Sequence, residues 1–152
     1  EIYTLSLHDA LPILVITLKS FARKTGRSWR SVYGLLHDDK ILTPNTTKTL
    51  HYIIELQRLQ RRFIEHKYEE ERIKDADGLL NVFKNISKKS LADILGVGVE
   101  TVYLVNSKRK VTSILLATAN IYLELEYYRA LAKGLLPKPY TLDYLKERGK
   151  IC

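Results

Sequence analysis

Cysteine is almost absent from the sequence, which contains one among 152 residues. An internal disulfide is therefore excluded, which suits a reducing cytoplasm. The four histidines are scattered and have no Cys or carboxylate cluster at ligand spacing, so no metal is expected. The longest apolar run, residues 11–18, is broken by Pro12 and is far shorter than a bilayer span. We expect no transmembrane segment.

Patterns that carry catalysis are also missing. Gly96 and Gly98 fit a turn between helices and not a loop that cradles phosphate. No paired carboxylates and no Ser/His/Asp arrangement stand out along the chain. We therefore expect a binding protein, not an enzyme, and no cofactor.

Positive charge is what the sequence does have. It holds 25 Lys and Arg against 17 Asp and Glu, a formal net charge of +8, with a pI near 9.5. This surplus favours a polyanionic partner, either nucleic acid or an anionic membrane face. Residues 14–66 hold ten basic and four acidic side chains, a surplus of six, whereas residues 86–132 hold six and four, a surplus of two.

The first thirteen residues need separate treatment. Residues 1–13, EIYTLSLHDALPI, resemble the in-frame translation of a common high-throughput sequencing adapter. We expect this segment to be an assembly artefact of metagenomic reads that replaces the natural N-terminus, and we exclude it from functional reasoning.

The rest of the chain predicts an all-α fold. Helices are expected at about 19–24, from Ser28 to about 37, and from near Thr46 with no clear stop before about residue 75. The predicted organisation is a first helix-turn-helix unit (14–66), a charged helical connector (67–85), a second such unit (86–134) and a basic tail (135–152).

An internal repeat links the two units. A shift of seventy positions lays Ser90–Asn106 over Ser20–Leu36, and one residue dropped in the loop lays 122–126 over 53–57. Shared small, turn and core positions in the same order indicate an internal duplication. The alternative is chance similarity between amphipathic helical segments.

The repeated residues fit the needs of a helix-turn-helix motif. Its first helix needs a small residue where the second helix crosses, and its turn needs a residue that tolerates positive φ. Ala22 and Ala92 fit the crossing, and Gly26 and Gly96 fit the turn. The buried side of the second helix is expected to hold Val32, Leu35 and Leu36 in the first unit, and Val102 and Val105 in the second unit.

Thr17–Leu50 resembles the DNA-binding headpiece of lac-repressor-type regulators, through Thr17, Ala22, Thr25, Gly26, Ser28, Val32, Leu36, Pro44 and Thr46. Ser90–Asn106 resembles this headpiece too, and equally the lambda-repressor and Cro-like group. The resemblance implies a sequence-specific regulator that binds double-stranded DNA, of phage or mobile-element type.

The resemblance also implies roles for individual residues. Trp29 and Arg30 are expected to contact base edges in the major groove, where Gly34 offers no side chain. For Trp29, a core position at the start of a helix is the alternative. Backbone phosphates are expected to be held by Lys19, Arg23, Lys24, Arg27, Ser28 and Ser31, and after the second unit by Lys108, Arg109 and Lys110.

The second unit carries different side chains at the equivalent positions, namely Val99, Glu100 and Leu104. Exposed apolar residues suit a protein contact better than a wet groove, so this unit is expected to assist weakly or to pair chains as a homodimer. The alternative is that both units dock on successive half-sites. For the whole chain, the other functions in play are a DNA-binding accessory in recombination or packaging, and a protein-interaction module without DNA affinity.

Overall fold

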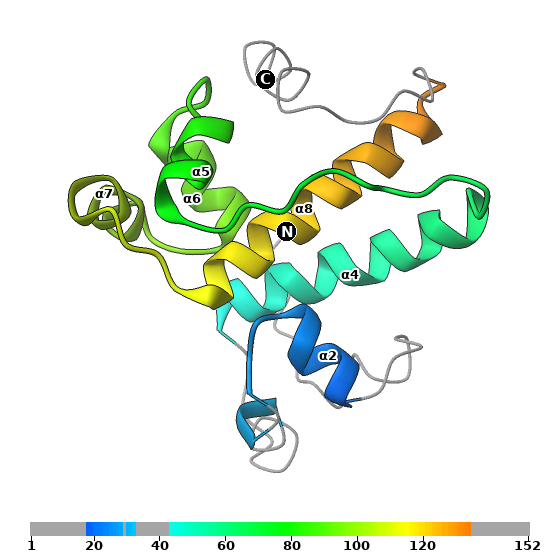
Figure 1. Cartoon of the computed structure of the whole chain (residues 1–152), viewed down its shortest axis with the longest axis horizontal. Helices are drawn as coiled ribbons and strands as arrows, with labels where there is room; N and C mark the ends of the chain where they lie inside the picture. The colour runs from blue at the N-terminus through cyan, green and yellow to red at the C-terminus, as the bar shows by residue number, and fades with distance from the viewer. Residues whose placement is uncertain (1–17, 29, 33–42, 135–152) are drawn as a thin grey trace.

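The computed structural model describes residues 18–28, 30–32 and 43–134, and every regular element in these ranges is helical (Figure 1). Residues 30–32 are helical, and the longer elements are α2 (Leu18–Lys24), α4 (Pro44–Arg62), α5 (Ala76–Val82), α6 (Lys88–Leu95), α7 (Val99–Lys108) and α8 (Ser113–Ala132). The predicted all-α class is confirmed. No helix among these residues is long and apolar enough to cross a membrane. The expectations for residues 1–13 and 135–152 lie outside the described ranges.

Hydroxyl side chains cap both long helices at matching positions. The Thr43 hydroxyl accepts a hydrogen bond from the Thr46 amide at the start of α4, and the Thr112 hydroxyl accepts one from the Leu115 amide at the start of α8. Each such cap satisfies an amide that has no partner inside its helix. Thr43 and Thr112 are sixty-nine positions apart, which is the offset of the repeat in this part of the chain.

The two turn glycines have the backbone that the sequence predicts. Gly26 has φ of 70° and Gly96 has φ of 68°, the left-handed region that glycine adopts without steric cost. Ala22 and Ala92 are buried, as the helix crossing requires. The amides that follow the glycines close equivalent turns, from Arg27 to the Ala22 carbonyl at 2.9 Å and from Val97 to the Ala92 carbonyl at 3.0 Å.

The apolar core forms two clusters that share α8. The first cluster joins α2, Val32 and α4 to the second half of α8, and the second joins α5, α6 and α7 to the first half of α8. Tyr122 packs against both clusters. The sequence segments 14–66 and 86–134 therefore do not form separate cores, because α8 completes the core of the first unit.

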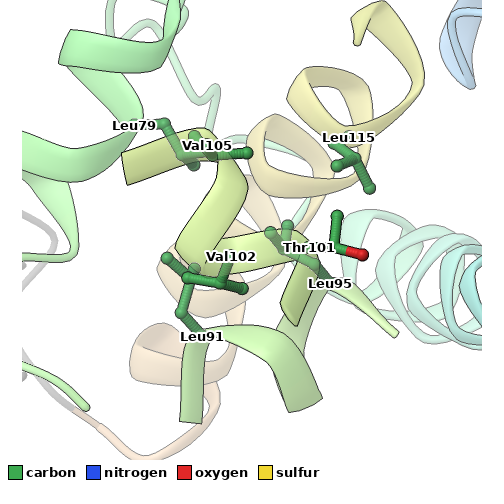
Figure 2. Close-up of a pocket in the computed structure, with 7 residues that line it drawn as sticks. All are labelled: Leu79, Leu91, Leu95, Thr101, Val102, Val105 and Leu115. Carbon is green, nitrogen blue, oxygen red and sulfur yellow. The ribbon is translucent and has the colours of Figure 1, made fainter. Parts of the chain in front are cut away.

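The inner face of α7 is tightly packed. Val102 and Val105 are 1% and 5% exposed, which confirms their predicted burial. Figure 2 shows the side chains gathered beneath this helix, and they leave no room for a water molecule; they are Leu79, Leu91, Leu95, Thr101, Val102, Val105 and Leu115. This packing fixes which face of α7 is turned outward.

The helix predicted for the start of the connector is wrong. α4 ends at Arg62, and residues 66–74 have no regular structure before α5 begins at Ala76. Two side chains of α8 instead bind the backbone near the two ends of this segment. The Asn120 amide group donates to the Ile73 carbonyl and accepts from the Ile73 amide, and the Tyr128 hydroxyl donates to the His66 carbonyl. These long-range hydrogen bonds replace the local ones of a helix.

α4 and α8 pack along each other through polar and aromatic contacts. The Thr49 and Thr118 hydroxyls lie 2.9 Å apart in the buried part of the contact. The Asn45 amide nitrogen donates to the Thr118 hydroxyl at 3.1 Å, and the rings of Tyr52 and Tyr122 lie 5.4 Å apart. Thr49 and Thr118 occupy corresponding positions of the repeat.

The far part of the α4–α8 contact is reciprocal. Gln60 on α4 donates to Glu124 on α8 at 2.7 Å. Arg129 on α8, the counterpart of Gln60, donates to Glu55 on α4, the counterpart of Glu124, at 2.8 Å. The same two positions of the repeat thus meet twice, once in each direction.

The turn glycines take part in a second reciprocal contact. A Cβ built on Gly26 would lie 2.7 Å from the Ser113 carbonyl oxygen, at the start of α8. A Cβ on Gly96 would lie 2.9 Å from the Pro44 carbonyl oxygen and from the Cα of Asn45, at the start of α4. Each turn therefore packs against the first turn of the long helix of the other unit.

The pKa values of Glu55 and Glu124 are shifted in opposite directions although their positions correspond. The hydrogen bond from Arg129 lowers the pKa of Glu55, whereas burial raises the pKa of Glu124, whose hydrogen-bond donor is the neutral Gln60. A lowered folded-state pKa contributes stability above the unfolded pKa, and that contribution is lost as pH falls through the lowered value. A raised folded-state pKa contributes stability below the unfolded pKa, and that contribution is lost as pH rises through the raised value.

We expect Glu55→Gln and Glu124→Gln to change the pH dependence of stability in opposite ways. Glu55→Gln should lower the free energy of unfolding at neutral pH, by about 1 kcal/mol or less because the pair is partly exposed, and the loss should vanish in acid. Glu124→Gln should remove the decline in stability as pH rises above 4.5, the ordinary pKa of glutamate. Urea unfolding between about pH 3 and pH 8 measures both. Parallel curves for the two variants would contradict this assignment.

Candidate nucleic-acid interface

Arg30 lies on the outside of the helical residues 30–32. Its side chain is exposed, whereas Val32 is completely buried against the first core cluster, as predicted. The Ser28 hydroxyl accepts a hydrogen bond from the Ser31 amide at 3.1 Å, so Ser28 is the predicted cap of this helix. Core packing and the cap together hold Arg30 toward solvent.

Hydroxyl and basic residues lie near Arg30 along the chain. Ser28, Ser31 and Arg23 are exposed, so all three are open to a backbone phosphate. Lys19 belongs to α2, but its side chain lies outside the described part of the chain, as do Trp29, Gly34, Leu35 and Leu36.

Lys24 and Arg27 are less available than the sequence predicts. Lys24 is half-buried and, with Glu124 and Arg72, lines a cleft of about 280 Å³ beside α8. Its positive charge acts on the Glu124 carboxylate. Their inward position makes both basic side chains part of the protein's own packing, so their predicted contact with phosphate gains no support from this geometry.

The Arg27 guanidinium packs against the start of α4. Its Nη2 donates to the Asn45 side-chain oxygen at 3.3 Å and to the Thr46 hydroxyl. Its Nη1 is buried and has no hydrogen-bond partner in the described residues. Burial lowers the pKa of Arg27 from its ordinary value.

The outer face of α7 differs from the prediction at one residue. Val99 is half-buried and packs against the second core cluster, so its predicted exposure is wrong. Leu104 is 52% exposed and Glu100 is exposed, as expected, and Tyr103, which was not among the expected contact residues, is 56% exposed. The signal was available, because Val99 shares one helix face with the buried Val102 three positions later.

The surface of the second unit is more basic than its residue count indicates. Glu126 is buried and pairs with Arg129 at 2.9 Å, and Glu124 is bonded to Gln60, so neither carboxylate belongs to the outer face of α7. Lys88 lies over the Tyr103 ring at 5.9 Å. Exposed cations flank α7 at its end and at the start of α6; they are Lys89, Lys108, Arg109 and Lys110. Of these, Arg109 contacts Asp77 at 3.5 Å.

Two outward helix faces are thus the candidate contact surfaces, one around Arg30 and one on α7 around Glu100, Tyr103 and Leu104. Within the described ranges, no three His, Cys, Asp or Glu side chains gather as a metal site would require. Comparison of the chain with protein-family models, with curated proteins and with solved structures found no match.

Proposed function

We propose that this protein binds double-stranded DNA in a sequence-specific manner, as a transcription regulator of phage or mobile-element type. The observation that carries the proposal is the placement of Arg30. It is exposed on a capped helix whose opposite side is fixed by the fully buried Val32, and it follows a small-residue crossing at Ala22 and a left-handed turn at Gly26.

The chemistry of this face suits the major groove. An arginine guanidinium can donate two hydrogen bonds to O6 and N7 of guanine, which is the commonest specific contact in protein–DNA complexes. Exposed hydroxyl and basic groups nearby, Ser28, Ser31 and Arg23, can hold phosphates and so set the orientation of the helix on the duplex. Side chains suited to base contact and side chains suited to backbone contact therefore belong to the same predicted unit.

A protein-interaction module that lacks DNA affinity is the second candidate. The exposed Tyr103 and Leu104 favour it, because large apolar side chains exposed together are common at protein interfaces. A DNA-binding accessory in recombination or packaging would use the same DNA contacts as a regulator.

Selection from a pool of random duplexes with the full chain is the test of DNA binding. Enrichment of a defined motif is the expected result, because Arg30 favours guanine at one position. A pool that remains random after repeated rounds would reject sequence-specific binding and leave the protein-interaction module as the better explanation.

We also expect binding to the selected duplex to depend strongly on salt, because contacts with phosphates release counterions. For three phosphates neutralised by Lys or Arg side chains, the affinity should fall roughly 40-fold between about 50 and 200 mM salt. Fluorescence anisotropy across a salt series measures the slope. An affinity that does not change with salt would exclude recognition through the phosphate backbone.

A further inference from the structure

We propose that the chain is an internal pseudo-dimer whose two units bind one duplex at two unlike half-sites in inverted orientation. This inference rests on the proposed DNA binding and adds to it the arrangement of the target. It also assigns the outer face of α7 to DNA.

The contacts between the two units are reciprocal. The Gly26 turn packs on the start of α8, and the Gly96 turn packs on the start of α4. A twofold relation produces such matched pairs, because any contact from one half to the other is repeated in the opposite direction. A head-to-tail arrangement would use two different surfaces and leave the contacts unmatched.

The α4–α8 contact locates the twofold axis. Thr49 and Thr118 correspond to each other in the repeat and also touch each other, which happens only where the axis passes between two equivalent residues. Further along the helices, the Gln60–Glu124 and Arg129–Glu55 pairs exchange equivalent positions. The axis therefore runs between α4 and α8 along their length.

The placement of the two outward faces determines how the half-sites are oriented. α4 and α8 begin side by side, and residues 30–32 and α7 lie on opposite sides of that shared end (Figure 1). A twofold rotation makes residues 30–32 and α7 run in opposite directions along a duplex. Half-sites recognised by units related in this way are inverted repeats, and the centres of two such sites are separated by about 10 base pairs or a multiple of this.

The side chains of the α7 face favour DNA over a second protein. Lys88 lies over the Tyr103 ring, Lys89 is exposed at the start of α6, and Lys108 and Lys110 are exposed at and just beyond the end of α7. A surface that binds another protein is depleted of lysine. Cations at both ends of this stretch of the chain suit contact with backbone phosphates. An apolar side chain such as Leu104 can contact the methyl group of thymine.

The two half-sites are expected to differ in sequence. Glu100 occupies the position in the second unit that Arg30 occupies in the first. A glutamate accepts a hydrogen bond from N4 of cytosine, whereas an arginine donates to guanine. The expected target is therefore an inverted pair with guanine specified on one side and cytosine on the other.

The test combines duplex selection with a count of chains. Selection with the full chain should enrich two half-sites in inverted orientation, and native mass spectrometry of the selected duplex should find one chain bound. A direct repeat, a single half-site, or two chains on the inverted pair would overturn the pseudo-dimer and leave DNA binding intact. A pool without any motif would instead reject the proposed function, on which this inference depends.

Surface variants then assign each half-site to its unit. Glu100→Gln should relax the cytosine preference of one half-site by about fivefold or more and leave the guanine of the other half-site unchanged. Arg61→Ala, an exposed change in the last turn of α4 and away from both faces, should alter neither half-site. A cytosine preference that persists in Glu100→Gln would overturn the assignment of the α7 face to DNA.

Discussion

Arg30→Ala is expected to weaken binding to the selected duplex by about 5- to 150-fold, which corresponds to about 1–3 kcal/mol. The reason is that Arg30 is exposed on a helix whose Val32 is fully buried, so its guanidinium is directed to solvent, where it can reach a base edge. The loss should concentrate on one base position, where the variant accepts other bases with little further penalty. Competition among duplexes that differ only at that position measures the effect.

Two controls separate base contact from general charge. Arg30→Lys keeps the positive charge but loses the planar pair of donors, so it should retain the salt dependence and still lose most of the preference for guanine. Arg61→Ala removes another exposed arginine, at the far end of α4, and should leave the preference intact. Equal losses for Arg30→Ala and Arg61→Ala would contradict base recognition by Arg30.

Gly26→Ala and Gly96→Ala are each expected to lower the free energy of unfolding by about 2–5 kcal/mol. A non-glycine residue at positive φ costs about 1–2 kcal/mol, and forcing a methyl group into packed surroundings adds about 1–3 kcal/mol. The obstructing atoms belong to the backbone, the Ser113 carbonyl for Gly26 and the Pro44 carbonyl for Gly96, so neither can rotate aside as a side chain would.

Gly134 provides the matched control. It also has a positive φ, of 74°, but a Cβ built there meets nothing within 4 Å. Gly134→Ala should therefore lose only the backbone share, about 1–2 kcal/mol. Chemical denaturation of the three variants measures the comparison. If all three lost the same stability, the close approach of each turn to the opposite long helix would contribute nothing.

Local features of the fold were predictable from the sequence because local chemistry determines them. Glycine is the residue that adopts positive φ without cost, so Gly26 and Gly96 identified the turns. The spacing of Val102 and Val105 identified the buried face of α7. The outward position of Arg30 was expected from the resemblance to a DNA-binding headpiece, and the burial of Val32 two positions later agrees with it.

Features that depend on distant partners were not predictable in this way. The segment before Ile73 is held without a helix by Asn120, which is 47 residues away along the chain. Arg27 faces α4 because Asn45 and Thr46 accept its hydrogen bonds across the turn. Hydrophobic periodicity shows which face of α4 is apolar but does not name the helix that covers it. The repeat was visible in the sequence, whereas the pairing of α4 with α8 could be seen only in the structure.

The connection of α4 and α8 within one chain has a consequence for dosage. A dimer of separate chains dissociates on dilution, so its DNA occupancy at low abundance rises with the square of concentration. Here covalent linkage keeps both halves together at any concentration, and occupancy of a target would rise in simple proportion to the number of molecules.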